Sequence, residues 1–153
     1  MKKIQIGGHK KGKIGYALVS DEDFEKINQH NWFFNGSYAA SRIEGKNIRM
    51  HTFLMNTPKG METDHIDGNG LNNQRLNLRV CTHRENSLNQ TIRKNNTSGI
   101  KGVCWSIQYK KWEVKIRAGN KRLTVGRFLN LKDATIAYRK AADKYHGNFA
   151  RYV

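Results

Sequence analysis

Residues 111–118 alternate apolar and charged side chains with the two-residue period of a β-strand, and this pattern constrains the fold more than any other part of the chain. The apolar positions are Trp112, Val114 and Ile116, and each is followed by a charged residue. A further strand is expected at residues 121–128. Gly119-Asn120 is a favoured hairpin turn. Together with a strand expected at residues 102–109, the pattern predicts a three-stranded antiparallel sheet with one apolar face and one charged face.

The apolar face of this sheet needs a cover, and the segment after it has the period of a helix. Asn130-Leu131-Lys132-Asp133 predicts capping at the start, and Gly147 predicts the end. Small and aromatic side chains recur at helical spacing between these points, which predicts that the helix packs on the sheet. The stripe consists of Ala134, Ala137, Tyr138, Ala141, Ala142 and Tyr145.

The N-terminal part is predicted to be rich in short strands, at residues 13–19, 32–43 and 47–54, with a turn at Asn35-Gly36. Ser20-Asp21-Glu22-Asp23 has the pattern of a capping box and precedes apolar residues at helical spacing, so a short helix is expected there. The fold class is therefore α+β.

Charge divides the chain into two modules. The 28 Lys and Arg residues outnumber the 12 Asp and Glu residues, for a formal net charge of +16. Residues 1–92 carry a net charge of +4 and residues 93–153 a net charge of +12. Residues 88–99 are polar and basic, as expected of a linker. We therefore predict two domains, 1–92 and 93–153, and a nucleic-acid partner.

Several other classes of protein are not favoured. No apolar run approaches the roughly 20 residues of a membrane span, and the N-terminus does not have the apolar core of a signal peptide, so a cytoplasmic protein is expected. Cys81 and Cys104 are too few for a disulfide framework or a four-cysteine zinc site. Asp67-Gly68-Asn69 lacks the spaced acids and the closing glutamate of a calcium-binding EF-hand loop.

Asp64 and His65 stand together at the end of a strand expected at residues 61–66, and they are the candidate chemical centre. A carboxylate is a hard oxygen ligand for Mg²⁺ or Mn²⁺, and an imidazole can act as a general base. Thr82-His83-Arg84-Glu85 is a second capping box, so a helix is expected to begin after Thr82 and to place Asn86 and Asn89 on one face. An amide oxygen from Asn86 would complete a metal site suited to phosphodiester hydrolysis.

These residues resemble the HNH endonucleases of the phage and intron-encoded homing type. The resemblance is carried by Asp64-His65-Ile66-Asp67-Gly68-Asn69, Asn77-Leu78 and Glu85-Asn86 with Asn89. It implies a ββα-metal fold for residues 61–92, with Asp64 and Asn86 as metal ligands. It also implies that His65 is the general base and that Asn77 fixes the loop and orients the histidine. The family often has a His-Arg pair upstream where this chain has His51-Thr52, which leaves the role of His51 open.

Residues 98–153 resemble the DNA-binding domain of APETALA2/ethylene-response factors. The matching segments are Ser98-Gly99-Ile100-Lys101-Gly102-Val103, Lys111-Trp112, Ile116-Arg117, Gly126-Arg127-Phe128 and Gly147-Asn148-Phe149-Ala150. The resemblance implies that the sheet binds duplex DNA through Lys115, Arg117, Arg122 and Thr124, with the helix behind it. A two- or three-stranded ribbon fits the major groove, which supports the same expectation.

The sequence thus predicts a metal-dependent DNA endonuclease of the homing type, using Mg²⁺ or Mn²⁺, without a small-molecule cofactor or a membrane partner. One such centre per monomer cuts one strand, so nicking is expected. The resemblance favours a phage protein in the cytoplasm of its host, or a nucleoid-associated protein. The alternative is a non-catalytic DNA-binding transcriptional regulator, and a third class is an RNA-binding protein.

Overall fold

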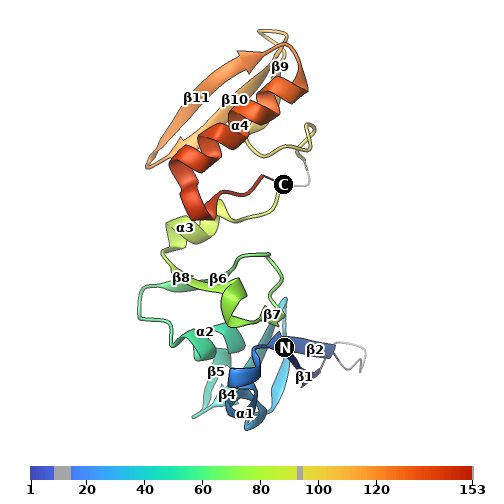
Figure 1. Ribbon diagram of the computed structural model, residues 1–153, viewed down its shortest axis with the longest axis vertical. Coiled ribbons are helices and arrows are strands. Elements are labelled where there is room, and N and C mark those ends of the chain that lie inside the picture. Colours follow the sequence, from blue (N-terminus) through green and yellow to red (C-terminus); the bar gives the residue numbers. More distant parts are fainter. Residues whose placement is uncertain (9–14, 93–94, 153) are drawn as a thin grey trace. The chain divides into compact units, whose positions relative to one another are not determined.

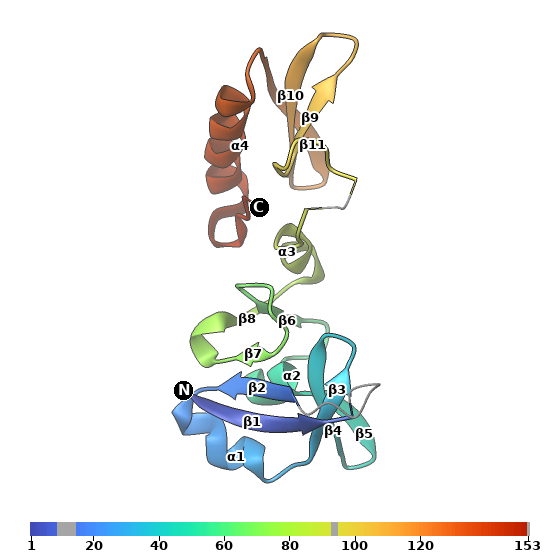
Figure 2. The same cartoon turned by 90° about the vertical axis from the view of Figure 1, so that its right-hand side faces the viewer.

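The computed structural model of the protein describes residues 1–8, 15–92 and 95–152, and the chain forms two compact units. The N-terminal unit is Met1–Asn86 and the C-terminal unit is Ser87–Val153, so the division falls six residues before the one expected from composition. Figures 1 and 2 show the chain in two views, and each unit is described here by itself.

A six-stranded sheet with the strand order β5-β4-β3-β1-β2-β7 forms most of the N-terminal unit. β1 pairs in parallel with β3 and antiparallel with β2, and β2 pairs in parallel with the very short β7. The six strands are β1 (Lys2–Gly7), β2 (Gly15–Val19), β3 (Trp32–Asn35), β4 (Tyr38–Ile43), β5 (Lys46–Arg49) and β7 (Asn72–Asn73). β1 was not expected from the sequence.

The hairpin expected around Asn35-Gly36 is confirmed, because β3 and β4 pair antiparallel on either side of it. The strand expected at residues 13–19 is present as β2 from residue 15, and its first two residues lie outside the described part of the chain. The short helix is also confirmed, as a 3₁₀ turn η1 (Asp21–Asp23) that continues into α1 (Phe24–Asn28). The prediction of a capping box at Ser20 is wrong, because the Ser20 hydroxyl does not cap this turn. It accepts a hydrogen bond of 2.9 Å from the backbone N–H of Arg75.

The strand expected at residues 47–54 is wrong in its second half. β5 ends at Arg49, and residues 50–55 form the helix α2 (Met50–Met55), which ends at Asn56 in a left-handed conformation with φ of 45°. Met50 and Leu54 are four residues apart, so a helix places both on the face that enters the core. Burial of Met50 and Leu54 in the core therefore outweighs the local preference of this segment for a strand.

The hydrophobic core of the N-terminal unit lies between the sheet and α1 and α2, and it includes Ile4, Ile6, Ala17, Val19, Ile27, Trp32, Met50 and Leu54. A separate two-stranded antiparallel sheet pairs β6 (Glu62–His65) with β8 (Leu78–Cys81). The turn η2 (Arg75–Asn77) precedes β8, and α3 (His83–Leu88) follows it. Leu78 joins the core, which anchors the small sheet to the rest of the unit.

The C-terminal unit is the three-stranded sheet with a covering helix that the sequence predicted. Its elements are β9 (Val103–Ser106), β10 (Lys111–Ala118), β11 (Lys121–Phe128), α4 (Leu131–His146) and the 3₁₀ turn η3 (Gly147–Phe149). The strands are antiparallel in the order β11-β10-β9, and α4 lies along one face of the sheet (Figures 1 and 2). β9 is shorter than expected, because it ends at Ser106.

The boundaries of α4 agree with the sequence. The Asn130 side chain accepts a hydrogen bond of 2.8 Å from the Asp133 N–H, and Gly147 is the C-terminal cap. Ala134, Tyr138 and Ala142 are buried against Val114 and Ile116 in the core of this unit. Tyr145 was predicted to pack on the sheet with these residues, but it is 42% exposed, so the prediction for Tyr145 is wrong.

The segment expected to be a linker is folded where the structure describes it. The Asn96 amide donates to the Ile100 carbonyl and accepts from the Gly99 N–H, and the Ser98 hydroxyl donates to the Val103 carbonyl over 2.7 Å. The expected linker also includes residues 93 and 94, which lie outside the described part. In the described ranges, the structure contains no helix that is long and apolar enough to cross a membrane.

Candidate functional site

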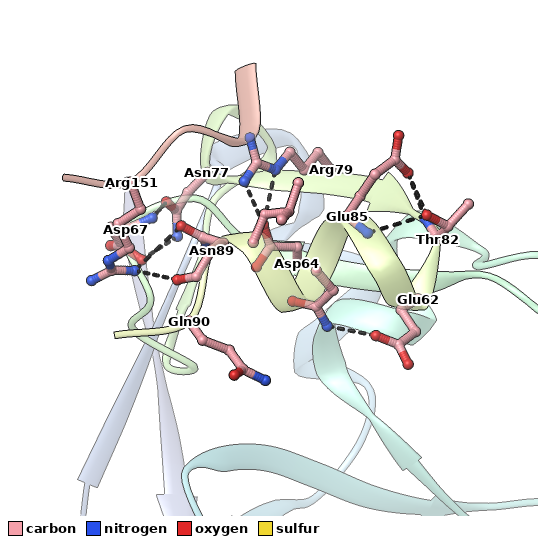
Figure 3. A network of polar contacts seen from close by, with 12 residues as sticks. Glu62, Asp64, Asp67, Asn77, Arg79, Thr82, Glu85, Asn89, Gln90 and Arg151 are labelled. Atoms are coloured by element: carbon pink, nitrogen blue, oxygen red, sulfur yellow. Dashed lines mark hydrogen bonds and ion pairs between the residues drawn. The ribbon is translucent and has the colours of Figure 1, made fainter. Parts of the chain in front are cut away.

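The two-stranded sheet places Asp64 directly opposite Arg79. The Arg79 guanidinium donates two hydrogen bonds to Oδ2 of Asp64, from Nη2 over 2.6 Å and from Nε over 2.9 Å (Figure 3). The side chain of Asp64 is only 6% exposed and that of Arg79 16%. A buried carboxylate needs such a partner, because an unpaired charge away from water is costly. The candidate metal ligand therefore lies against a cationic side chain.

The helix α3 begins with the capping box predicted from the sequence. The Glu85 carboxylate accepts from the Thr82 N–H over 2.8 Å, and the Thr82 hydroxyl accepts from the Glu85 N–H over 3.2 Å (Figure 3). The cap fixes the direction in which the helix leaves β8. Asn86 therefore points back toward β6, while Asn89, expected on the same helical face, lies beyond the end of the helix.

Asn86 contacts Glu62, two residues before Asp64 on the same strand. Its amide nitrogen donates to Oε2 of Glu62 over 2.6 Å, and Nδ1 of His83 lies 2.7 Å from Oε1 of the same carboxylate. The hydrogen bonds from Asn86 and His83 lower the pKa of Glu62. Residues two apart on a strand share a face, so Glu62 and Asp64 project to the same side of β6. The helix and the strand are thus joined at the carboxylate face.

His65 lies in a pocket of aromatic and amide side chains from the N-terminal sheet and α2. Its ring stacks on Tyr38 with a centroid distance of 5.9 Å and meets His51 edge to face at 4.8 Å. Its Nε2 lies 3.2 Å from Oδ1 of Asn73. His65 is 5% exposed, His51 4% and Asn73 0%. Tertiary packing therefore holds the imidazole on several sides.

Burial keeps the imidazoles of His51 and His65 neutral at physiological pH. Loss of hydration lowers the pKa of His51 to about 3, and the neighbouring His65 and Arg49 act in the same direction. Loss of hydration also lowers the pKa of His65, although the hydrogen bond to Asn73 and the charges of Asp67 and Asp64 oppose the shift. A neutral imidazole can accept a proton, which is what a general base must do.

Asn77 holds the loop between β6 and β8. Its Oδ1 accepts from the Asp67 N–H over 3.0 Å, and its Nδ2 donates to Oδ1 of Asp67 over 2.9 Å and to the Asn72 carbonyl over 2.7 Å. Although partial burial opposes the shift, hydrogen bonds from Asn69, Asn72 and Asn77 lower the pKa of Asp67. Asn77 thus braces the loop that follows His65.

The residues at this face fit a hard divalent cation by their donor chemistry. Asp64 offers a carboxylate and Asn86 an amide oxygen, and Glu62 adds a second carboxylate two residues away; oxygen donors of this kind suit Mg²⁺ and Mn²⁺. Across the described ranges, no three His, Cys, Asp or Glu side chains form a cluster able to hold an ion. In the structure Asn86 contacts Glu62 and Asp64 contacts Arg79, so a cation held by Asp64 and Asn86 would take its remaining ligands from water and substrate oxygens.

The four candidate DNA-binding residues lie on one face of the C-terminal sheet. Lys115 pairs with Thr124 and Arg117 pairs with Arg122 across β10 and β11. A bulge after Val114 shifts the register of the two strands. Val114 pairs with Gly126, and Lys115, the next residue, pairs with Thr124. Val114 and Ile116 point to the opposite face, toward α4. The four side chains thus project from the face of the sheet that α4 does not cover.

The structure also brings residues to the site that the sequence analysis did not assign. Glu62, Arg79 and Asn73 contact candidate site residues directly, and Tyr38 and His51 form walls around His65. Period-two alternation placed Glu62 on the same face as Asp64, and this signal was present in the sequence. No comparable local signal pointed to Tyr38 or Asn73, which are distant in the chain or embedded in a polar loop.

Comparisons with known proteins agree with this region of the structure. A family model described as HNH endonuclease matches residues 56–88, which contain β6, β8 and α3. The match includes Asp64, His65, Asn77 and Asn86. No solved structure matches the chain significantly.

Relatives from viruses match a larger part of the chain. The chain is 39% identical over 95 residues to Protein 3.8 of Escherichia phage T7, over 62% of this chain and 78% of that protein. It is 34% identical over 100 residues to "Uncharacterized HNH endonuclease L560" of Acanthamoeba polyphaga mimivirus, over 61% of this chain and 51% of that protein. The chain therefore belongs to the HNH endonuclease family, with its HNH domain at residues 56–88.

Proposed function

We propose that the protein is a metal-dependent DNA endonuclease that nicks duplex DNA, with His65 as the general base and with Asp64 and Asn86 as metal ligands. The observation that carries the proposal is the arrangement at the small sheet. A buried, neutral imidazole follows directly after a buried carboxylate, and the helix bearing Asn86 is fastened to the same strand by Glu62.

The proposed reaction is hydrolysis of a phosphodiester bond. His65 accepts a proton from a water molecule as the water attacks phosphorus, and the bond to the 3′ oxygen breaks. A divalent cation, when bound by Asp64 and Asn86, stabilises the negative charge that develops on the departing oxygen. Tyr38 and His51 exclude water from two sides of the imidazole, and Asn77 holds the loop that follows it.

One observation favours a second candidate function, the non-catalytic DNA-binding regulator. Arg79 contributes two hydrogen bonds to the carboxylate of Asp64, and an ion pair of this kind also suits a purely structural role for the HNH region. The two functions differ in what a cation does. A nuclease must bind a cation at Asp64 in competition with Arg79, whereas a scaffold has no use for one.

Cleavage of supercoiled plasmid separates the two functions. Wild-type protein with Mg²⁺ or Mn²⁺ is expected to convert supercoiled plasmid to open circles, and EDTA is expected to abolish the conversion. Asp64→Asn retains an oxygen that accepts from Arg79 but loses the charge that binds a cation, so it is expected to remain folded and fail to nick. Plasmid that is retarded in a gel but stays uncut with both metals would favour the regulator.

We further propose that the C-terminal sheet binds duplex DNA through Lys115, Arg117, Arg122 and Thr124. Like charges directly opposite each other across two strands are destabilising, and Arg117 lies opposite Arg122. In the part of the chain that the structure describes, neither guanidinium has an acidic partner, whereas the Lys115 ammonium pairs with Glu113. Two unpaired arginines side by side are suited to bridge phosphates or to contact guanine.

Arg117→Ala combined with Arg122→Ala is expected to weaken duplex binding and to reduce its salt dependence. Loss of two phosphate contacts lowers the slope of log K against log salt by about 2. Fluorescence anisotropy with a labelled duplex between low and moderate salt measures both quantities. Lys132→Ala with Lys140→Ala removes the same charge from exposed positions on α4 and is the matched control. Equal losses in both double variants would mean that diffuse charge, and not this face, binds the DNA.

A further inference from the structure

Asn73 is a buried polar residue in contact with the candidate general base, and nothing in the sequence assigned it a role. It belongs to the two-residue strand β7 and is fully buried. Its Oδ1 lies 3.2 Å from Nε2 of His65. We propose that Asn73 is a positioning residue that holds the proton of His65 on Nε2 and so presents the lone pair on Nδ1 to the attacking water. This inference rests on the proposed nuclease function.

The chemistry of the amide determines which nitrogen of His65 carries the proton. A neutral imidazole has one N–H and one lone pair, and an amide oxygen only accepts hydrogen bonds. Oδ1 of Asn73 therefore selects the tautomer with hydrogen on Nε2, which is the donor in this bond. If the amide were reversed, its nitrogen would donate to Nε2 and the proton would move to Nδ1. The orientation of one amide thus decides whether Nδ1 can act as a base.

The backbone around Asn73 is held by the six-stranded sheet. β7 pairs in parallel with β2, with Asn73 beside Val19, and the Leu18 N–H donates to the Leu71 carbonyl over 2.8 Å. The strands that form the core of the unit therefore set the position of the amide. Tyr38 and His51 restrict the tilt of the His65 ring, but aromatic contacts do not distinguish one nitrogen from the other.

The hydrogen bonding of Asn73 indicates a role other than stability. Its Nδ2 is buried and has no hydrogen-bond partner in the described structure, so the side chain leaves one polar group unsatisfied. An unsatisfied buried donor destabilises a fold, and an apolar side chain would avoid that cost. A buried asparagine bonded to the candidate base is explained if that bond is needed for the chemistry.

Asn77 provides the contrast. The family resemblance implied that Asn77 both fixes the loop and orients the histidine. Its side chain is engaged with Asp67 and with the Asn72 carbonyl, so it fixes the loop, whereas the amide bonded to the imidazole is that of Asn73. Loss of Asn77 is therefore expected to reduce stability, and loss of Asn73 is expected to change the tautomer.

The tautomer can be measured directly in the metal-free protein. Long-range ¹⁵N–¹H NMR spectra of the neutral His65 ring are expected to show a protonated Nε2 and an unprotonated Nδ1 in the wild type. Asn73→Leu is expected to give a mixture of tautomers. Asn73→Asp keeps an acceptor oxygen and is expected to retain the proton on Nε2. The Trp32 indole N–H, which donates to the Ile27 carbonyl, reports in the same samples whether the N-terminal unit is folded.

Cleavage rates complete the test. Removal of a residue that orients a functional histidine typically costs about 10- to 100-fold, so Asn73→Leu is expected to nick plasmid more slowly by that factor, and Asn73→Asp less so. Asn77→Ala is the matched control, which is expected to lower stability while the folded fraction keeps the wild-type tautomer. A wild-type proton on Nδ1, or an Asn73→Leu variant with unchanged tautomer and rate, would overturn the inference.

Failure of the inference is distinguishable from failure of the proposed function. If wild-type protein nicks plasmid and Asn73→Leu nicks it equally well, the nuclease stands and the role of Asn73 is wrong. If wild-type protein does not nick under either metal but the tautomer follows Asn73 as expected, the positioning stands and the nuclease is wrong.

Discussion

His65→Ala is expected to slow plasmid nicking by roughly two to four orders of magnitude, which is the usual contribution of a positioned general base. Desolvation lowers the pKa of His65, so the ring is neutral and able to accept a proton at physiological pH. In the alanine variant no positioned imidazole accepts the proton of the attacking water. Single-turnover conversion of supercoiled plasmid to open circles measures the loss, because product release does not limit it.

Two further measurements, DNA affinity and pH dependence, serve as controls for this prediction. The charged face of the C-terminal sheet is unchanged in His65→Ala, so its affinity for duplex DNA is expected to equal that of the wild type. The pH dependence of the wild type gives a second check. Protonated imidazole cannot act as a base, so activity is expected to fall with decreasing pH only below the ordinary histidine pKa of 6.5. An unchanged nicking rate in His65→Ala would assign the base to another residue.

His51 is expected to make the N-terminal unit sensitive to acid. Its side chain is 4% exposed and its Nδ1 has no hydrogen-bond partner among the described residues, so a positive charge there is poorly compensated. Burial lowers the pKa of His51 from 6.5 to about 3, and the charge of Arg49, with that of His65 when its ring is protonated, acts in the same direction. The folded state therefore binds a proton less readily than the unfolded state does.

The direction of the effect follows from this difference in proton binding. The stability due to neutral His51 is complete above pH 6.5 and is lost progressively as the pH falls from 6.5 toward 3. A shift of this size corresponds to a loss of about 2 kcal/mol between pH 7 and pH 5, if each pH unit contributes about 1.4 kcal/mol. His51→Gln cannot take up a proton there and is expected to lack this contribution.

Urea unfolding of wild type and His51→Gln at pH 7 and pH 5 measures the difference. The NMR signal of the Trp32 indole N–H reports on the N-terminal unit alone, which avoids interference from the other unit. The pKa of His65 is also lowered, and because His65 is present in both proteins its contribution largely cancels. Parallel pH dependences in the two proteins would show that His51 is not the acid-sensitive group.

Expectations from local sequence held where the neighbouring residues decide the structure. The Thr82–Glu85 capping box was confirmed because both of its hydrogen bonds join residues three apart in the chain. The alternation along residues 111–118 was confirmed because the side chains of a strand point to opposite faces whatever covers them. The same logic placed Asn130 at the start of the last helix.

Expectations failed where a distant residue competes for the same group. The Ser20 hydroxyl had the local pattern of a helix cap, yet it accepts from the Arg75 N–H, 55 residues away. Residues 50–54 had a strand pattern, yet they form part of α2 because a helix buries Met50 and Leu54 together. Local propensities are small compared with the burial of large apolar side chains, so packing prevails.

The sequence by itself determined the α+β class, the Asp64-His65 pair in its strand, and the basic sheet with its covering helix. These features depend on spacing within short segments, where the periods of strands and helices apply. Only the tertiary structure decided what surrounds the candidate base and the candidate ligands. Asn73 and Tyr38 at His65, and Arg79 at Asp64, meet their partners through strand pairing and core packing between separate elements. Such contacts have no local period, because they arise only when the chain closes its hydrophobic core.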